Sequence, residues 1–200
     1  MPLIASFAGM TSKTRIAIFA SGSGTNAEEI FKYFQKHAFA EIALLLSNNP
    51  DAYALVRAKK YGVDTKVFTK IQFRESDEIL NWLKETNITH IVLAGFLWLI
   101  PQNLITAFPN RIINIHPALL PKFGGKGLYG MKVHEAVKTA GEKQTGITIH
   151  EVNERYDDGR ILFQATCEVL PSDTPVQIAD KIHRLEHAHY PKVIGQWIGA

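Results

Sequence analysis

The sequence predicts an α/β protein with a mostly parallel, Rossmann-like sheet flanked by helices and an antiparallel extension in the C-terminal half. Two observations support this fold class. From Arg15 onward, short β-branched or aliphatic runs alternate with longer amphipathic runs, as they do in successive βαβ units. After Ile115 this pattern gives way to two longer runs with a two-residue period, which is typical of paired antiparallel strands.

The first half is expected to alternate strands with helices. The β-branched and aliphatic runs predict strands at residues 16–20, 41–46, 66–68, 90–94 and 112–115. The amphipathic runs predict helices at residues 27–35, 52–61 and 74–85.

The second half is expected to begin with a glycine-rich loop and a helix near residues 132–139. Two antiparallel strands should follow at residues 146–152 and 161–170, and a last helix should run from about residue 175 to 187. Parallel sheets bind ligands beyond the carboxyl ends of their strands. The loops of interest are therefore those at residues 21–26, 95–99, 114–117 and 153–159.

Length and composition favour one buried core. The chain has 200 residues, of which 46% are hydrophobic, and this suits one domain better than two. We expect residues 15–200 to form that single domain. Residues 1–14 are expected to be a disordered extension, with Met10 as the true start.

Charge and hydropathy exclude several classes of protein. A net charge of +3 is too small for the basic stripe of a nucleic-acid binder, and it suits an anionic small molecule better. The longest apolar run, residues 91–100, ends at Pro101 and is too short to cross a membrane. The first residues lack a secretory signal, so a cytoplasmic location is expected. The single cysteine, Cys167, excludes a disulfide within the chain and is expected to be a buried structural thiol.

The stretch Ser-Gly-Ser-Gly-Thr-Asn at residues 21–26 is a candidate phosphate-binding loop. It follows the first expected strand and opens a helix, so free N–H groups and the helix dipole would face an anion. It lacks the third glycine of a dinucleotide fingerprint and the lysine of a P-loop. The alternative is an ordinary tight turn with Thr25 or Asn26 as the helix N-cap.

Asn114 and His116 are candidate catalytic residues. Alternation along a strand places their side chains on the same side, where an amide and an imidazole could act on one substrate atom. Such a pair suits acyl transfer, with proton transfer by the imidazole and oxyanion stabilisation by the amide. The alternative is a structural histidine at a strand end beside a turn asparagine.

The turn Tyr-Asp-Asp-Gly at residues 156–159 could supply the carboxylate that orients this histidine and raises its pKa. A turn of this composition is also ordinary, so only its combination with the asparagine and histidine indicates a site.

The histidines of the last helix allow a second kind of site. His183 and His187 lie one helical turn apart, close to Glu186 and His189, a spacing that would suit a metal. The stretch lacks the order of a zinc peptidase motif, so a solvated face or the rim of a ligand site is favoured. His134 and His150 are expected to serve structure or the edge of the site, and Trp82 and Trp98 the core or a pocket wall; Trp98 is the better placed for a flat ring ligand.

Four motifs occur in the order found in a known family. They are the loop at residues 21–26, Leu-Ala-Gly-Phe at 93–96, Asn-Ile-His-Pro-Ala-Leu-Leu-Pro at 114–121 and Glu-His-Ala-His-Tyr-Pro at 186–191. Over residues 15–197 the chain resembles the phosphoribosylglycinamide formyltransferases, folate-dependent enzymes of purine synthesis.

The resemblance implies an activity. A member of this family transfers the formyl group of 10-formyltetrahydrofolate, its co-substrate, to the amino group of 5'-phosphoribosylglycinamide in de novo purine (IMP) biosynthesis. The products are formylglycinamide ribonucleotide and tetrahydrofolate. No metal is expected, and the partners would be these small molecules, without nucleic acid or membrane. The protein would be a monomer or a homodimer.

The resemblance also implies roles for particular residues. The catalytic trio would be Asn114, His116 and Asp157. The phosphate of the ribonucleotide would be bound by Gly24, Thr25 and Asn26, and its sugar by Glu186. The folate would be flanked by Arg74, by the backbone of Leu97, Trp98, Leu99 and Ile100, and by Asn114.

Two features depart from the family pattern. The loop at residues 122–130 is longer than the more familiar Tyr-Pro-Gly version, which affects contacts beside the ribonucleotide. Trp98 stands where many members have arginine, which affects side-chain contacts at that position.

Three rival functions share part of the pattern. Formyltetrahydrofolate deformylase uses the same trio but delivers the formyl group to water, and it would be expected to have a regulatory domain before the first strand. Methionyl-tRNA formyltransferase would be expected to have an RNA-binding domain after the last helix. A binding module that keeps only the fold and the phosphate loop would be expected to have a broken trio, whereas all three residues are present.

Overall fold

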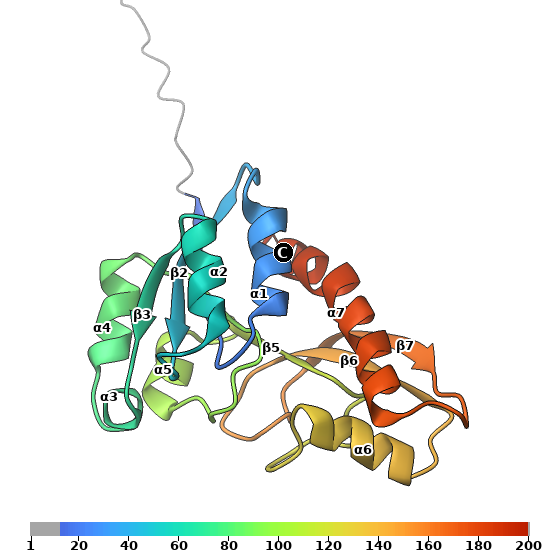
Figure 1. The fold of residues 1–200 in the computed structure, drawn as a ribbon. Coiled ribbons are helices and arrows are strands. Elements are labelled where there is room, and N and C mark those ends of the chain that lie inside the picture. Colours follow the sequence, from blue (N-terminus) through green and yellow to red (C-terminus); the bar gives the residue numbers. More distant parts are fainter. Residues whose placement is uncertain (1–12, 200) are drawn as a thin grey trace, which may run out of the picture.

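The computed structural model describes residues 13–199. In this part of the chain, seven strands form one sheet flanked by helices (Figure 1). The strands are β1 (Thr14–Phe19), β2 (Ala40–Ser47), β3 (Asp64–Val67), β4 (His90–Leu93), β5 (Ile112–His116), β6 (Gln144–Glu151) and β7 (Ile161–Glu168). The helices are α1 (Thr25–Phe34), α2 (Tyr53–Lys60), α3 (Lys70–Arg74), α4 (Glu78–Glu85), α5 (Gln102–Ala107), α6 (Met131–Thr139) and α7 (Pro175–Trp197).

The strand order is β3-β2-β1-β4-β5-β6-β7. Strands β1 to β5 run parallel to one another, whereas β6 pairs antiparallel with both β5 and β7. The predicted α/β class, with a mostly parallel sheet and an antiparallel C-terminal extension, is therefore confirmed. The chain adds strands outward from β1 on one side and then resumes at β4 on the other, which makes the β1–β4 boundary a topological switch point.

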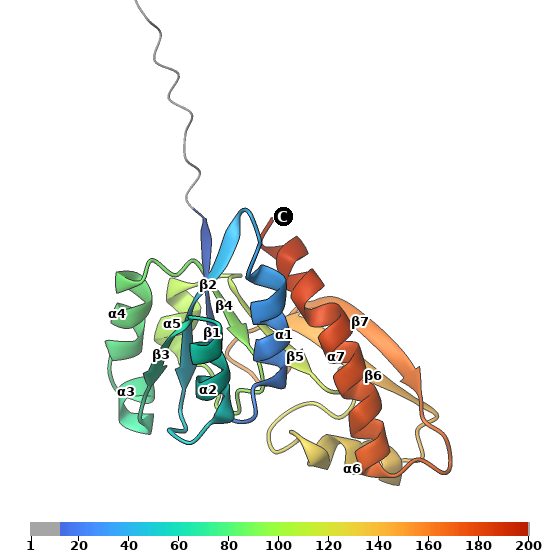
Figure 2. The same cartoon turned by 45° about the horizontal axis from the view of Figure 1, so that its top comes forward.

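Alternation along β1 explains the two hydrophobic cores. Ile16 and Ile18 belong to a core shared with α1, α2 and α7, while Ala17 and Phe19 belong to a core shared with α3, α4 and α5. All four side chains are fully buried. A strand covered on both faces reads as a continuous apolar run, as this one does. Figures 1 and 2 show α1, α2 and α7 together on one face of the sheet.

The helices of the structure differ from the expected ones in three places. The single helix expected at residues 74–85 is two helices, because a capping box at Thr69 starts α3 early and the chain breaks before α4 begins at Glu78. Helix α5 was not predicted, because only Leu104 of its six residues is buried and it lacks a clear periodic pattern. Helix α7 runs past Pro191 to Trp197 because Tyr190, Pro191 and Ile194 are buried against the core, so packing outweighs the missing N–H of proline.

The structure bears only in part on the expectations for the N-terminal segment, for Cys167 and for membrane spans. The expected extension at residues 1–14 lies outside the described residues except for residue 13 and Thr14, which already belongs to β1. Cys167 is half-buried on β7 rather than fully buried. Within residues 13–199, no helix is both long and apolar enough to cross a membrane.

Candidate active site

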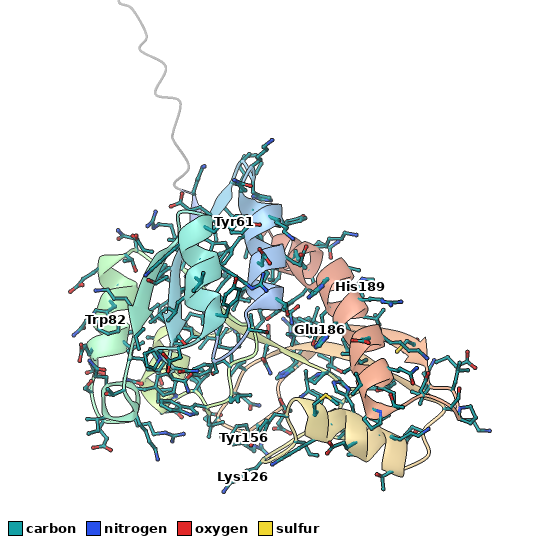
Figure 3. The ribbon with its side chains drawn as sticks, in the orientation of Figure 1. Tyr61, Trp82, Lys126, Tyr156, Glu186 and His189 are labelled. Carbon is teal, nitrogen blue, oxygen red and sulfur yellow. The ribbon has the colours of Figure 1, made fainter. Side chains whose placement is uncertain are left out.

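A cavity of about 560 Å³ lies at the carboxyl ends of the parallel strands. All four loops predicted to matter line it, together with the loop that precedes α6 and part of α7. Its size is ordinary for a site that binds small molecules. Figure 3 shows Lys126 and Tyr156, both of which line the cavity, at the same end of the molecule.

His116 ends β5 and is almost fully buried at the cavity wall. Its Nε2 lies 2.8 Å from the carbonyl oxygen of Phe123, and because a carbonyl only accepts, Nε2–H is the donor. Its Nδ1 lies 3.5 Å from Oδ2 of Asp157. Burial lowers the pKa of His116 below its ordinary value, although the Asp157 carboxylate and the Phe123 carbonyl oppose this by favouring the imidazolium.

Asp157 reaches His116 from the loop between β6 and β7. Its backbone has a φ of 53°, a left-handed conformation that aspartate tolerates better than most residues. Its Oδ2 also accepts a hydrogen bond of 2.9 Å from the N–H of Gly125. Burial by itself would raise the pKa of Asp157, but His150, His116 and the Gly125 N–H together hold this pKa below its usual value. Asp157 is therefore an anion at neutral pH and ties the loop before α6 to the histidine.

Asn114 contacts His150, which was expected to serve structure or the edge of the site. His150 on β6 pairs directly with Asn114 on β5 in the antiparallel ladder, and Asn114 Nδ2 lies 3.3 Å from His150 Nε2. His150 Nδ1–H donates to the carbonyl oxygen of Glu151 at 2.8 Å, because a carbonyl only accepts. Asn114 itself lines the cavity.

His150 also approaches the carboxylate of Asp157, at 3.6 Å from its Nε2 to Oδ1. The expected trio is thus a group of four side chains that includes His150. The strand pattern showed that His150 lies on a strand. It did not show which residue of β5 the histidine faces, because pairing register is not encoded locally.

Buried Thr148 fixes the segment that follows β5. Its hydroxyl donates to the carbonyl of Ala118 at 2.7 Å and accepts from the N–H of Leu120 at 3.0 Å. Gln164 on β7 donates to the same hydroxyl at 2.9 Å. These bonds anchor the stretch between His116 and the glycine-rich loop to the antiparallel strands.

The loop at residues 21–26 forms one end of the cavity. Gly24 is the N-cap of α1 and has a φ of 74°. A Cβ at this position would lie 2.6 Å from Cα of Ala54, so both conformation and space require glycine. The expected glycine-rich turn into a helix N-terminus is confirmed, with the first N–H groups of α1 at the cavity.

Asn26 and Glu186 meet across this end of the cavity. Asn26 Nδ2 donates to Oε2 of Glu186 at 2.9 Å, and Figure 3 shows Glu186 pointing from α7 toward α1. Burial raises the pKa of Glu186, while the Asn26 hydrogen bond and nearby His183 act in the opposite direction. Asn26 Oδ1 is buried and has no hydrogen-bond partner among the described residues.

Two further histidines line the cavity. His134 on α6 is buried, and burial together with His183 on α7 and His116 lowers its pKa to about 4. The edge-of-site interpretation of His134 and the ligand-rim interpretation of His183 agree with these positions. Within residues 13–199, no three His, Cys, Asp or Glu residues lie in an arrangement that could hold a metal ion.

The segment after β4 forms the opposite wall. Leu97, Trp98, Leu99 and Ile100 all line the cavity. Trp98 packs against Phe73, with ring centroids 5.6 Å apart, and against Phe68, at 6.0 Å. The tryptophan is therefore a cavity wall backed by an aromatic cluster, as expected. Trp82 instead packs at the edge of the core.

Arg74 does not line the cavity. It is the last residue of α3 and is exposed to solvent. The preceding residue, Phe73, is buried against Trp98, so Arg74 follows in sequence a residue that backs the wall formed by the segment after β4. Of the residues expected at the site, all but Arg74 line the cavity.

Comparison with known proteins adds to this geometry. The model of the formyl transferase family matches residues 14–194. A phosphoribosylglycinamide formyltransferase of Bacillus subtilis is 36% identical over 192 residues, which cover 92% of this chain and 95% of that protein. The chloroplastic phosphoribosylglycinamide formyltransferases of Arabidopsis thaliana and Vigna unguiculata are 42% and 37% identical over 92% and 91% of this chain. The chain spans 65% and 60% of the lengths of these two plant proteins.

Solved structures agree with the sequence comparisons. Glycinamide ribonucleotide transformylase 1 from Symbiobacterium toebii superposes with a TM-score of 0.84 at 34% identity, covering 91% of this chain and 86% of that one. The phosphoribosylglycinamide formyltransferase from Bacillus halodurans superposes with a TM-score of 0.82 at 36% identity, covering 92% of this chain and 94% of that one.

Proposed function

Since the chain belongs to the phosphoribosylglycinamide formyltransferase family, we propose that it transfers a formyl group from 10-formyltetrahydrofolate to the amino group of 5'-phosphoribosylglycinamide. The products are formylglycinamide ribonucleotide and tetrahydrofolate, and the reaction belongs to purine biosynthesis. Both substrates are small molecules.

One observation carries this proposal. A single cavity joins a glycine-rich loop at a helix N-terminus to the group formed by Asn114, His116 and Asp157. The loop suits the phosphate of a ribonucleotide, and the polar group suits acyl transfer. The Trp98 wall lies in the same cavity and offers an apolar surface to the folate ring.

The chemistry follows from these side chains. The amino nitrogen of the ribonucleotide attacks the formyl carbon, and the carbonyl oxygen becomes an oxyanion stabilised by the side-chain amide of Asn114 and by protonated His116. The bond from carbon to the folate nitrogen then breaks, and that nitrogen takes a proton from His116. His116 recovers a proton from the attacking nitrogen, so protons balance over the cycle. The Asp157 carboxylate partly offsets the effect of burial on the His116 pKa and so favours the imidazolium.

His116 cannot deliver its Nε2 proton while it donates to Phe123. The carbonyl of Phe123 holds that hydrogen at 2.8 Å between the heavy atoms. Proton delivery from Nε2 therefore requires the loop at residues 122–130 to give up this bond when substrates enter. This loop, whose length departs from the family pattern, is the segment that must adjust because it contains Phe123.

The remaining expected roles belong to the same proposal. Gly24, Thr25 and Asn26 hold the phosphate, and Glu186, already bonded to Asn26, contacts the sugar. The folate is flanked by Asn114, by the backbone of residues 97–100 and by Arg74. Arg74 can contact only a part of the folate that extends beyond the cavity, because its side chain lies outside the lining.

The proposal extends to the whole protein. Residues 15–200 form a single formyltransferase domain that acts as a monomer or a homodimer in the cytoplasm. One sheet with two cores supports the single domain. Two plant relatives are named chloroplastic, so fractionation of the source cells tests the compartment, and sedimentation tests the oligomeric state.

The decisive experiment is a spectrophotometric assay of folate product with 10-formyltetrahydrofolate, run with and without glycinamide ribonucleotide. Turnover that depends on the ribonucleotide supports the transferase. Turnover without it would show the deformylase reaction instead, and no turnover under either condition would leave only a nucleotide-binding module.

A further inference from the structure

Helix α2 packs against the back of the loop at residues 21–26. The N–H of Ala54 donates to the carbonyl of Gly22 at 3.1 Å. Gly24 lies so close that a Cβ there would be 2.6 Å from Cα of Ala54. The shape of the loop is therefore imposed by α2 as well as by its own glycines.

Arg57 makes a second contact between α2 and this loop. Its Nε donates to the carbonyl of Ser23 at 3.0 Å. The same guanidinium forms an ion pair with Glu28 on α1 and lies 5.0 Å from the centre of the Tyr53 ring. The Arg57 side chain is only 23% exposed, so it is an ordered bridge between α2, the loop and α1.

The hydrogen bonds from Ala54 to Gly22 and from Arg57 to Ser23 determine where the loop directs its N–H groups. In a trans peptide the C=O and the following N–H point in opposite directions. The carbonyls of Gly22 and Ser23 are turned toward α2, so the N–H groups of Ser23 and Gly24 point away from α2. Both residues line the cavity. Successive N–H groups arranged in this way form a nest for an anion.

We propose that Arg57 is the positioning residue of the phosphate-binding loop. By holding the Ser23 carbonyl, it keeps the Gly24 N–H directed at the phosphate of the ribonucleotide. This inference rests on the proposed function, because it takes the anion in the loop to be that phosphate. Lysine cannot replace Arg57 in this role. Only a planar guanidinium can bond the Ser23 carbonyl through Nε and Glu28 through a second nitrogen at the same time.

Arg57→Lys is the sharpest test, because it keeps the charge and removes the fixed pair of bonds. The KM for glycinamide ribonucleotide should rise about 10-fold or more, as expected if the Gly24 N–H no longer donates a charge-assisted hydrogen bond to the phosphate. The kcat and the KM for 10-formyltetrahydrofolate should stay within about twofold of wild type. Glu28→Gln, which leaves the Ser23 bond in place, should have a smaller effect. Lys59→Arg on the same helix is the matched control, because it exchanges the same two side chains at an exposed position.

Inorganic phosphate, tested as a competitor of the ribonucleotide, separates this inference from the function on which it rests. Competition in wild type that weakens in Arg57→Lys, in step with the rise in KM, supports the positioning role. Competition that is equal in wild type and Arg57→Lys overturns the positioning role. An equal rise in the KM for glycinamide ribonucleotide and the KM for 10-formyltetrahydrofolate also overturns it, because it would indicate general damage to the fold. An absence of competition in wild type overturns the phosphate assignment itself.

Discussion

His116 and Asp157 lie in contact at the cavity wall, with 3.5 Å between Nδ1 and Oδ2. The histidine comes from the end of a parallel strand and the aspartate from the loop between two antiparallel strands. The carboxylate favours the imidazolium of a histidine whose pKa burial would otherwise lower further. Through this contact, the loop between β6 and β7 influences the protonation of the residue proposed to transfer protons.

Asp157→Asn should shift the pH dependence of kcat to lower pH. Removing the carboxylate removes an influence that raises the pKa of His116, so the imidazolium is lost at a lower pH as the pH rises. A pH–rate profile and an NMR titration of the His116 ring measure this shift. Asp158→Asn is the matched control, because Asp158 faces Arg155, at 3.2 Å from its Oδ2 to the arginine Nε. Equal profiles in the two variants would contradict the role of Asp157.

His116→Ala should lower kcat by about 10²–10⁴-fold, the usual contribution of general acid–base catalysis. Affinity for glycinamide ribonucleotide should remain largely intact, because the phosphate loop lies at another part of the cavity. Steady-state kinetics with titration calorimetry separate these two effects. Near-normal turnover in this variant would rule out the mechanism.

Gly24→Ala should destabilise the protein and weaken ribonucleotide binding. A residue with a side chain at positive φ costs about 1–3 kcal/mol, and the new Cβ would also lie 2.6 Å from Cα of Ala54. Urea unfolding and the KM for the ribonucleotide measure the two effects. For stability the control is Gly22→Ala, whose Cβ would meet no atom within 4 Å. Equal unfolding midpoints in both variants would show that α2 does not constrain the loop.

His90→Gln should make stability less sensitive to acid. Burial, together with nearby Arg111, lowers the pKa of His90 to about 4 from an ordinary value of 6.5. Protonation therefore favours the unfolded chain, and the stability that neutral His90 contributes is fully present above pH 6.5 and is lost as the pH falls toward 4. Urea unfolding across this range should give a shallower decline in the variant. An unchanged slope would contradict the burial of a neutral His90 against Trp197.

The sequence was a good guide where a feature depends on a short stretch of chain. The glycine-rich turn at residues 21–26 and the strand that carries Asn114 and His116 were predicted, because turn chemistry and two-residue alternation act locally. Helix α5 and the break between α3 and α4 were not, because short helices are decided by caps and packing more than by periodicity.

The sequence by itself determined the α/β class, the order of the main elements and the loops in which the candidate residues lie. Only the tertiary structure decided which residues meet. The register of β5 on β6 sets Asn114 against His150, and a hydrogen bond joins Asn26 to Glu186 across 160 positions of the chain. Propensity and periodicity act over a few residues, whereas register and long-range contacts follow from packing summed over the whole domain.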